Sequence, residues 1–176
     1  EKTNLAKAHP KTVDRLRVEF LRWFEDVTDG VTYQPVPIPI GHPSEPVVEI
    51  QPSWAKWQGK NIEYVFRGYD WDTIEGWKDK GEAATWNLDV LSPGTWEVEL
   101  SYGRSARGGG TLRLSVGDSV VECSPPPTPT ADVFERTVIG RLAIDKGEAI
   151  LKAEVVSAHG TELIRLNRLF LRRIEP

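Results

Sequence analysis

From residue 47 onward, apolar side chains recur at every second position in short segments, and this alternation constrains the fold more than any other feature. Alternation is typical of β-strands that bury one face and expose the other. Eight or nine such strands, with no helix-length periodic segment between them, predict a mainly β chain folded as an antiparallel β-sandwich of jelly-roll type. The predicted strands span residues 47–51, 62–66, 84–90, 95–102, 111–116, 119–122, 133–144, 149–156 and 162–173.

Residues 1–30 have a different period and predict one amphipathic α-helix. Pro10 favours a helix start, since its missing N–H costs nothing in a first turn, and the Asp29-Gly30 pair favours an end. A helix of this length is marginal in water by itself, so we expect its apolar stripe to lie on a partner surface. The stripe, at spacings of three and four, consists of Val13, Leu16, Phe20, Trp23, Phe24 and Val27.

Residues 31–46 are rich in proline and predict a connector between the helix and the sandwich. Alternating prolines remove backbone donors and favour extended polyproline geometry, so this segment is interpreted as a semi-rigid linker and not as a strand. Val36, Ile38 and Ile40 are expected to hold it along a surface. The predicted organisation is therefore a helix at 1–30, a linker at 31–46 and a β-sandwich module at 47–176.

Composition excludes several classes of function. The net charge of −4 and the pI near 5.5 give no basic face for nucleic acid, and no apolar stretch approaches the roughly 20 residues of a membrane span. The basic run Arg104–Arg107 leads into three glycines and is interpreted as a flexible hairpin tip. Because the sequence has no methionine and no signal-peptide pattern, we expect it to be a piece of a longer protein.

Two segments resemble a known family. The run EKTNLAKAHPKTVDRLRVEFLRWFEDV at the start resembles the last helix of the catalytic domain in bacterial arylsulfatases of the alkaline-phosphatase-like superfamily. The rest of the chain is similar, in strand order and in glycine and tryptophan placement, to the β-sandwich modules appended to sulfatases and fucosidases, which are generally taken to bind carbohydrate. The resemblance implies the carboxy-terminal part of a secreted or periplasmic sulfatase-like protein, whose partners are an upstream catalytic domain and a polysaccharide or glycan.

The single cysteine, Cys123, excludes an internal disulfide and a cysteine-based zinc site. Sulfatases convert the Cys or Ser of a C-x-P-x-R signature to formylglycine, but the string that begins at Cys123 has Pro127 where the signature needs arginine. The clustered Asp, Asn and His ligands that sulfate ester hydrolysis requires are also missing from the sequence. We therefore expect no catalytic residues in this chain.

Aromatic residues fall into two groups. Trp86, Trp96 and Tyr102 alternate with apolar residues within predicted strands and are expected in the core. The second group lies in loop-like segments rich in glycine and aspartate, where exposed rings could stack on the apolar C–H faces of sugars while carboxylates bind hydroxyls. The predicted carbohydrate-binding residues are Trp54, Trp57, Tyr69, Trp71 and Trp77, with Asp70, Asp72 and Glu75 as hydroxyl partners.

Other interpretations of this second group stay open. The tryptophans could instead pack the linker and the helix against the sandwich. The acidic residues could hold a calcium ion through their oxygen ligands, although their spacing does not match an EF-hand loop; no other metal or cofactor is predicted. Asp70 and Asp72 could form a glycosidase pair, roughly 7 Å apart on an extended segment, but nothing in the sequence distinguishes an acid from a nucleophile.

Three functions follow from these observations. The predicted one is a non-catalytic carbohydrate-binding module of a sulfatase-like enzyme. The alternative is a structural module that packs against the catalytic domain without a ligand of its own, and buried tryptophans would favour it. A free-standing enzyme on a jelly-roll scaffold fits least.

Overall fold

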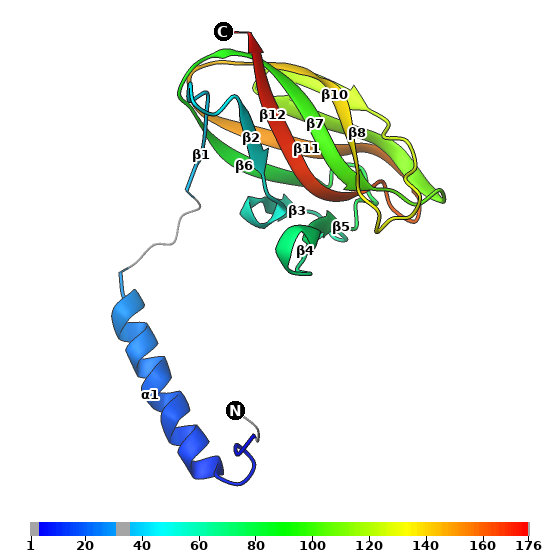
Figure 1. The fold of residues 1–176 in the computed structure, drawn as a ribbon. Helices are drawn as coiled ribbons and strands as arrows, with labels where there is room; N and C mark the ends of the chain where they lie inside the picture. The colour runs from blue at the N-terminus through cyan, green and yellow to red at the C-terminus, as the bar shows by residue number, and fades with distance from the viewer. Residues whose placement is uncertain (1–3, 31–35, 176) are drawn as a thin grey trace. The chain divides into compact units, whose positions relative to one another are not determined.

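The structure is a computed structural model that describes residues 4–30 and 36–175 (Figure 1). Its contacts divide the chain into two compact units, Glu1–Gln34 and Pro35–Pro176. We call them the helical unit and the sandwich unit and describe each by itself. Over the described residues, no helix has the length and apolar character needed to cross a membrane.

The helical unit contains the predicted amphipathic helix, α1 (Pro10–Thr28). Pro10 occupies its first turn, and the backbone N–H of Asp29 donates to the carbonyl of Glu25 at the carboxyl end (2.8 Å). Within the stripe, the ring of Phe20 lies 5.7 Å from that of Trp23, measured between centroids. No residue of α1 is buried, so the described part of this unit has no core of its own.

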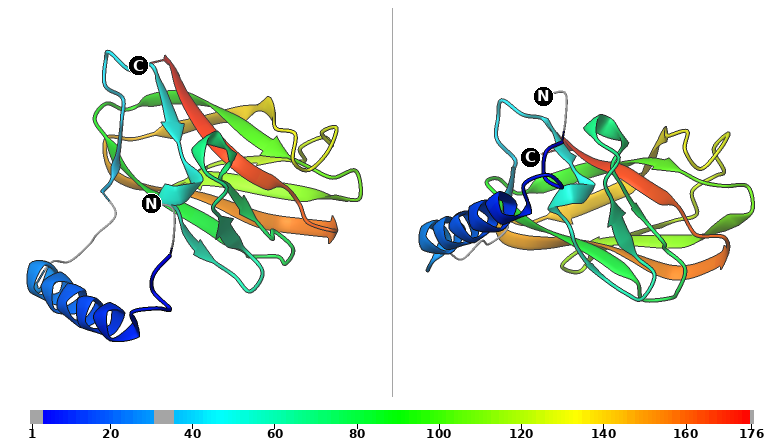
Figure 2. Two further views of the ribbon diagram at one scale, coloured as in Figure 1. Left: turned by 60° about the horizontal axis from the view of Figure 1, so that its bottom comes forward. Right: turned by 90° about the horizontal axis from the view of Figure 1, so that it is seen from below.

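The sandwich unit consists of two sheets, confirming the predicted mainly β, jelly-roll-type fold (Figures 1 and 2). One sheet has the order β1-β6-β11-β8-β9, with β3 also on β6; the other has the order β10-β7-β12-β5-β4, with β2 also on β12. All strand pairs are antiparallel except β1 with β6. The strands are β1 (Ile38–Ile40), β2 (Val47–Ile50), β3 (Lys56–Gln58), β4 (Glu63–Val65), β5 (Thr73–Glu75), β6 (Ala83–Val90), β7 (Gly94–Gly103), β8 (Gly108–Val116), β9 (Ser119–Cys123), β10 (Glu135–Ile144), β11 (Gly147–Gly160) and β12 (Arg165–Glu175).

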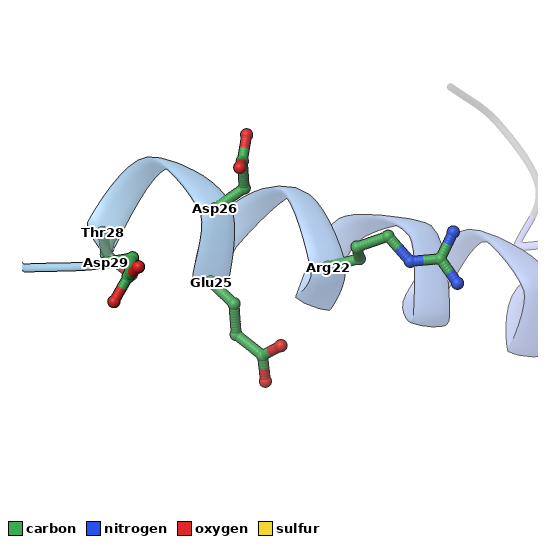
Figure 3. Close-up of a pocket in the computed structure, with 5 residues that line it drawn as sticks. All are labelled: Arg22, Glu25, Asp26, Thr28 and Asp29. Atoms are coloured by element: carbon green, nitrogen blue, oxygen red, sulfur yellow. The ribbon is translucent and has the colours of Figure 1, made fainter.

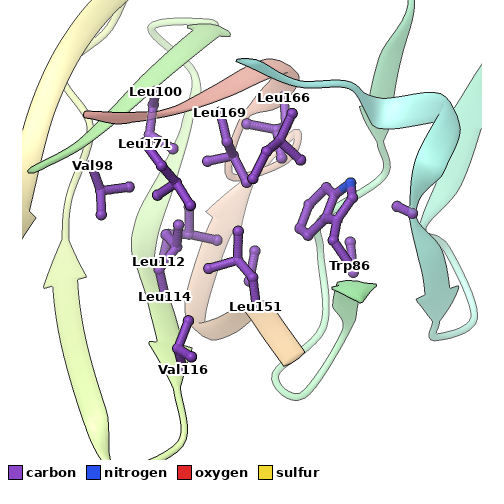
Figure 4. Close-up of a cluster of buried hydrophobic side chains, with 14 of the residues drawn as sticks. Trp86, Val98, Leu100, Leu112, Leu114, Val116, Leu151, Leu166, Leu169 and Leu171 are labelled. Carbon is purple, nitrogen blue, oxygen red and sulfur yellow. The ribbon is translucent and has the colours of Figure 1, made fainter. Parts of the chain in front are cut away.

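The core lies between the two sheets, where side chains from both inner faces meet (Figure 4). Trp86, Trp96 and Tyr102 are fully buried there, as predicted. The indole N–H of Trp86 donates to the carbonyl of Gln51 (2.9 Å), so this buried donor is satisfied. Burial of each large side chain stabilises the fold by about 1.5–3 kcal/mol, which makes this interior the main source of stability.

The prediction that the proline-rich connector contains no strand is wrong. Ile38, Pro39 and Ile40 form β1, which pairs in parallel with β6, and Leu91 donates its N–H to the carbonyl of Ile40 (2.9 Å). In a strand, the backbone N–H and C=O groups of alternate residues point to opposite sides. The nitrogen of Pro39, which carries no hydrogen, therefore faces away from β6, and the pairing loses no donor, as is usual for proline in an edge strand. Ile38 and Ile40 are buried as expected, whereas Val36 is 85% exposed. Residues 31–35 of the connector lie outside the described residues.

The interpretation of Arg104–Arg107 as a hairpin tip is also wrong, because the flanking strands β7 and β8 lie in different sheets, although Ala106 and Arg107 are exposed. Two of the three following glycines, Gly108 and Gly109, are buried in β8. A Cβ at Gly108 would lie only 2.1 Å from the carbonyl oxygen of Glu162, so the close approach of two backbones requires glycine there. The Arg104 guanidinium donates to the Gly108 carbonyl through Nε (3.0 Å) and Nη2 (2.8 Å), which fixes the connection.

The two long edges of the sandwich differ. At one edge β9 and β10 come together: Ala143 donates its N–H to Oγ of Ser119 (2.8 Å), and a Cβ at Gly140 would lie 2.3 Å from Cγ2 of Val121. At the other edge, β3 borders one sheet and β4 borders the other. This second edge carries Trp57, one of the aromatic residues that the sequence singled out.

Candidate functional site

Two aromatic residues bridge the sheets at the edge formed by β3 and β4. In the strand register, Trp57 of β3 lies opposite Ala84, and Tyr64 of β4 lies opposite Ile74. Residues paired across two strands share a face, and both partners are buried, so Trp57 and Tyr64 point toward the space between the sheets. Their rings stack with centroids 6.2 Å apart and planes 29° apart. Trp57 nevertheless stays 47% exposed.

Asp72 organises the loop between β4 and β5. Its carboxylate accepts hydrogen bonds from the hydroxyl of Tyr64 (2.7 Å) and from the backbone N–H groups of Arg67 (2.8 Å) and Gly68 (2.9 Å). Burial alone would raise the pKa of Asp72, but these hydrogen bonds and the nearby charge of Arg168 bring that pKa below its ordinary value. Burial and the bond to Asp72 raise the pKa of Tyr64 to about 12. Asp72 therefore stabilises the loop, which is a structural role the sequence did not indicate.

The short helix η2 (Tyr69–Trp71) presents Trp71 at the surface. Asn167, buried in an irregular stretch of β12, donates its amide to the carbonyls of Asp70 (2.7 Å) and Asp72 (3.1 Å) and so holds the backbone on both sides of Trp71. The Trp71 side chain is 56% exposed, and its ring contacts that of Phe134 at 5.8 Å in a tilted arrangement. The side chain of Tyr69 lies outside the described part of the chain.

Trp77 cannot belong to a surface site, which corrects the prediction. It is fully buried, and its indole N–H donates to the carbonyl of Ile74 (2.8 Å). Trp54, in contrast, is exposed in the short helix η1 (Pro52–Trp54), which contacts β5 and β12. Among the predicted aromatic residues with described side chains, three are therefore exposed and one belongs to the core.

Asp70 and Glu75 are both ion-paired within the sandwich unit. Oδ1 of Asp70 accepts a hydrogen bond from the largely buried Arg168 (3.1 Å). Glu75 accepts from the hydroxyl of Thr73 (2.6 Å) and pairs with Arg67 and with Arg165, the latter at 3.5 Å. Like Asp72, these carboxylates have protein partners, although Asp70 also faces solvent over most of its surface.

The proline-rich loop 124–134 brings in an aromatic residue that sequence reasoning missed, Phe134. Asp132, two residues earlier, pairs with Arg165 and with Arg67 (3.6 Å). Thr128, buried in the same loop, accepts a hydrogen bond from the backbone N–H of Arg104 (2.9 Å). The loop is thus attached at several points, and Phe134 is held beside Trp71. We call the two ring pairs, Trp57 with Tyr64 and Trp71 with Phe134, the aromatic band; the hydrogen bond from Tyr64 to Asp72, the residue after Trp71, links them.

The described residues do not indicate a metal site or a nucleophilic cysteine. Over residues 4–30 and 36–175, no group of three or more His, Cys, Asp and Glu side chains could hold a metal ion. Cys123 packs against the core, and its burial raises the pKa of the thiol to about 11, which disfavours a nucleophilic thiolate. The hollow on the last turns of α1 is open to solvent and is lined by side chains that point in different directions: Arg22, Glu25, Asp26, Thr28 and Asp29 (Figure 3).

Comparison with known proteins identifies the class of the fold. No protein-family model matches the chain, and no curated protein matches its sequence. Solved structures do match. A family 35 carbohydrate-binding module from Clostridium thermocellum aligns with a TM-score of 0.61 and 17% identity, over 73% of this chain and 98% of that chain. A family 35 module from Cellvibrio japonicus gives 0.58 and 18%, over 71% and 91%.

A family 6 module, from the carboxyl end of a marine laminarinase of Zobellia galactanivorans, gives a TM-score of 0.56 and 13% identity, over 72% of this chain and 99% of that chain. At these identities the likeness establishes the fold, and function must be argued from the site. The sandwich unit is therefore a jelly-roll module with the same architecture as these carbohydrate-binding modules.

Proposed function

We propose that the sandwich unit is a non-catalytic carbohydrate-binding module and that the aromatic band is its binding surface. The observation that carries the proposal is the state of Trp71, whose side chain is 56% exposed although Asn167 holds the backbone on both sides of it. An exposed aromatic ring on a fixed backbone loses little conformational entropy when a sugar ring stacks on it. The likeness in fold to carbohydrate-binding modules supports the same assignment.

The carboxylates near the band support binding without hydrolysis. A glycosidase acid needs a raised pKa, whereas the pKa of Asp72 is lowered by hydrogen bonds from Tyr64 and from backbone amides. Asp72 also uses those bonds to hold the loop, so it is not free to transfer a proton to a substrate. This arrangement supports a module that positions a polysaccharide for chemistry performed elsewhere.

We also propose that the module belongs to a secreted or periplasmic, sulfatase-like bacterial protein, with α1 as the last helix of its catalytic domain. The apolar stripe of α1 supports this, because it needs a surface to cover and no described residue of its own unit buries it. Measuring aryl sulfate hydrolysis by the longer protein that contains this sequence would test the assignment. A parent without sulfatase activity would contradict it and leave the binding proposal intact.

A second candidate is a structural module without a ligand. Its specific support is that Asp72 and Glu75, predicted as hydroxyl partners, already have partners within the protein. Against it stands the exposure of Trp54, Trp57 and Trp71, because buried tryptophans are what would have favoured a structural module. Carbohydrate binding therefore stays the better-supported function.

Affinity electrophoresis of the full chain in gels that contain soluble mannan, xylan, galactan or β-glucan tests the proposal. We expect retardation by at least one polymer, and Trp71→Ala or Trp57→Ala should weaken binding by roughly 1–3 kcal/mol, the range known for base stacking on aromatic side chains. Trp23→Ala removes an exposed tryptophan of the helical unit and is the matched control, expected to bind as the wild type does. Unchanged retardation of folded Trp71→Ala and Trp57→Ala would overturn the assignment of the site.

A further inference from the structure

We propose that the aromatic band selects an uncharged glycan and discriminates against sulfated or uronate-rich chains. The inference rests on the proposed carbohydrate-binding function and deepens it by naming the class of ligand. It depends on two observations, namely the engagement of the nearby arginines and the exposure of the nearby carboxylates.

The three arginines attached to the band are engaged by protein groups. Arg67 pairs with Glu75 and Asp132, and Arg165 pairs with those two acids and with Glu162 at 3.0 Å. Arginine is the side chain best suited to bind a carboxylate or a sulfate through paired donors. An anionic sugar would therefore have to displace an existing ion pair at the band.

The third arginine, Arg168, is also engaged by protein groups. Its side chain is only 6% exposed, and it donates to Glu49 (2.7 Å), to Asp70 (3.1 Å) and to the carbonyl of Asn167 (2.9 Å). A guanidinium with three acceptors and little solvent contact has small capacity to bind an incoming anion. It acts instead as a support beneath the η2 segment.

Two carboxylates remain largely exposed beside Trp71 and Phe134. The side chain of Asp70, directly before Trp71, is 97% exposed, and that of Asp132, two residues before Phe134, is 65% exposed. Six acids and three arginines make up this network, which leaves an excess of three negative charges: the acids are Glu49, Asp70, Asp72, Glu75, Asp132 and Glu162. A sulfate placed on the Trp71 ring would be repelled, while a neutral hydroxyl could donate to either exposed carboxylate.

Exposed cations outside this network include Lys56, directly before Trp57, and Arg107. Arg107 is exposed in the connection between β7 and β8, and the same connection adjoins loop 124–134, because a Cβ at Gly103 would lie 2.0 Å from the carbonyl oxygen of Ala131. Our inference assigns Lys56 and Arg107 no part in binding. Arg107→Gln is therefore expected to leave the affinities for neutral and sulfated polymers unchanged.

The test compares a neutral polymer with its own chemically sulfated derivative. The neutral polymer is whichever of mannan, xylan, galactan or β-glucan retards the full chain, and both forms are titrated at low ionic strength. We expect the sulfated form to bind roughly five- to tenfold more weakly, and added salt should narrow the gap because screening weakens the repulsion.

Charge variants localise the effect. Asp70→Asn, alone and with Asp132→Asn, should bring the two affinities closer together, because each change removes an exposed negative charge beside the rings. Asp145→Asn, in the turn between β10 and β11, removes an exposed carboxylate at the other end of β10 and is the matched control.

The outcomes separate the two proposals. A sulfated or uronate-rich polymer that binds as tightly as the neutral one, or an affinity gap that Asp70→Asn leaves unchanged, would overturn the inference about charge and leave carbohydrate binding standing. Failure of every polymer to bind would overturn the proposed function, and the inference with it.

Discussion

Glu82 offers a direct test of how the loops beside the band are held. This buried carboxylate accepts four hydrogen bonds: Oε1 from the backbone N–H (2.7 Å) and the side-chain amide (3.0 Å) of Asn61, and Oε2 from the backbone N–H groups of Lys78 (2.7 Å) and Asp79 (2.9 Å). It joins the segment between β3 and β4 to the segment between β5 and β6.

The change Glu82→Gln keeps the shape of the side chain but replaces one carboxylate oxygen with an NH₂ group, which cannot accept. The two hydrogen bonds to that oxygen, from Asn61 or from Lys78 and Asp79, are therefore lost. Hydrogen bonds to a charged group contribute about 1.5–3 kcal/mol each, and the unsatisfied donors add to the cost, so we expect a loss of about 3 kcal/mol. For a domain of this size the loss corresponds to roughly 10 °C in Tm, measured by circular dichroism. Glu148→Gln, exposed on β11, is the control and should be neutral.

The pH dependence of stability provides a second test of the role of Glu82. Burial would raise the pKa of Glu82, but bonds from the backbone of Asp79, Asn61 and Lys78 outweigh it and lower that pKa in the folded state. A lowered folded pKa contributes stability above the unfolded pKa, and this contribution is lost as pH falls toward the folded value. The wild type should therefore lose stability as pH falls below about 4.5, more steeply than Glu82→Gln. A loss under 1 kcal/mol in Glu82→Gln at pH 7, or parallel pH profiles, would refute this reasoning.

Two further outcomes are expected. Residues 36–176 alone should unfold cooperatively in urea at the midpoint of the full chain, because their core lies within one compact unit; a gradual transition would show that the sandwich needs the helix. Cys123→Ala should leave polymer binding unchanged, and the wild-type thiol should stay unmodified in mass spectra after expression with the formylglycine-generating system, because the thiol packs against the core; an aldehyde at position 123 would contradict this.

The alternation of apolar residues predicted most of the fold, because strands such as β6 and β11 bury every second side chain over many residues. It missed β1, β3 and β5, each three residues long, since so short a strand shows no measurable period. In β3, moreover, all three residues are exposed. Such strands form because the longer neighbour β6 or β12 offers free hydrogen-bonding groups at an edge, which local sequence does not encode.

The candidate site was predicted less completely, because long-range contacts decide which residues face solvent. Trp77 looked like a loop residue beside glycine, but the N–H of Gly76 donates to Glu162 (2.8 Å), and a Cβ at Gly76 would lie 2.0 Å from the carbonyl oxygen of Asn61. These contacts with distant segments place Trp77 in the core. Phe134 was missed for the opposite reason, since it lay at the start of a predicted strand and became part of the band only through the fold.

Binding at the aromatic band can be followed through the indole N–H signals of the seven tryptophans in a ¹⁵N-labelled full chain, assigned by single Trp→Phe variants. On titration with a polymer that retards the protein, we expect shifts at Trp71 and Trp57, and little change at buried Trp77, Trp86 and Trp96 or at Trp23 of the helical unit. Binding that leaves both Trp71 and Trp57 unshifted, or that shifts Trp23 as much as Trp71, would contradict the assignment of the aromatic band as the carbohydrate-binding surface.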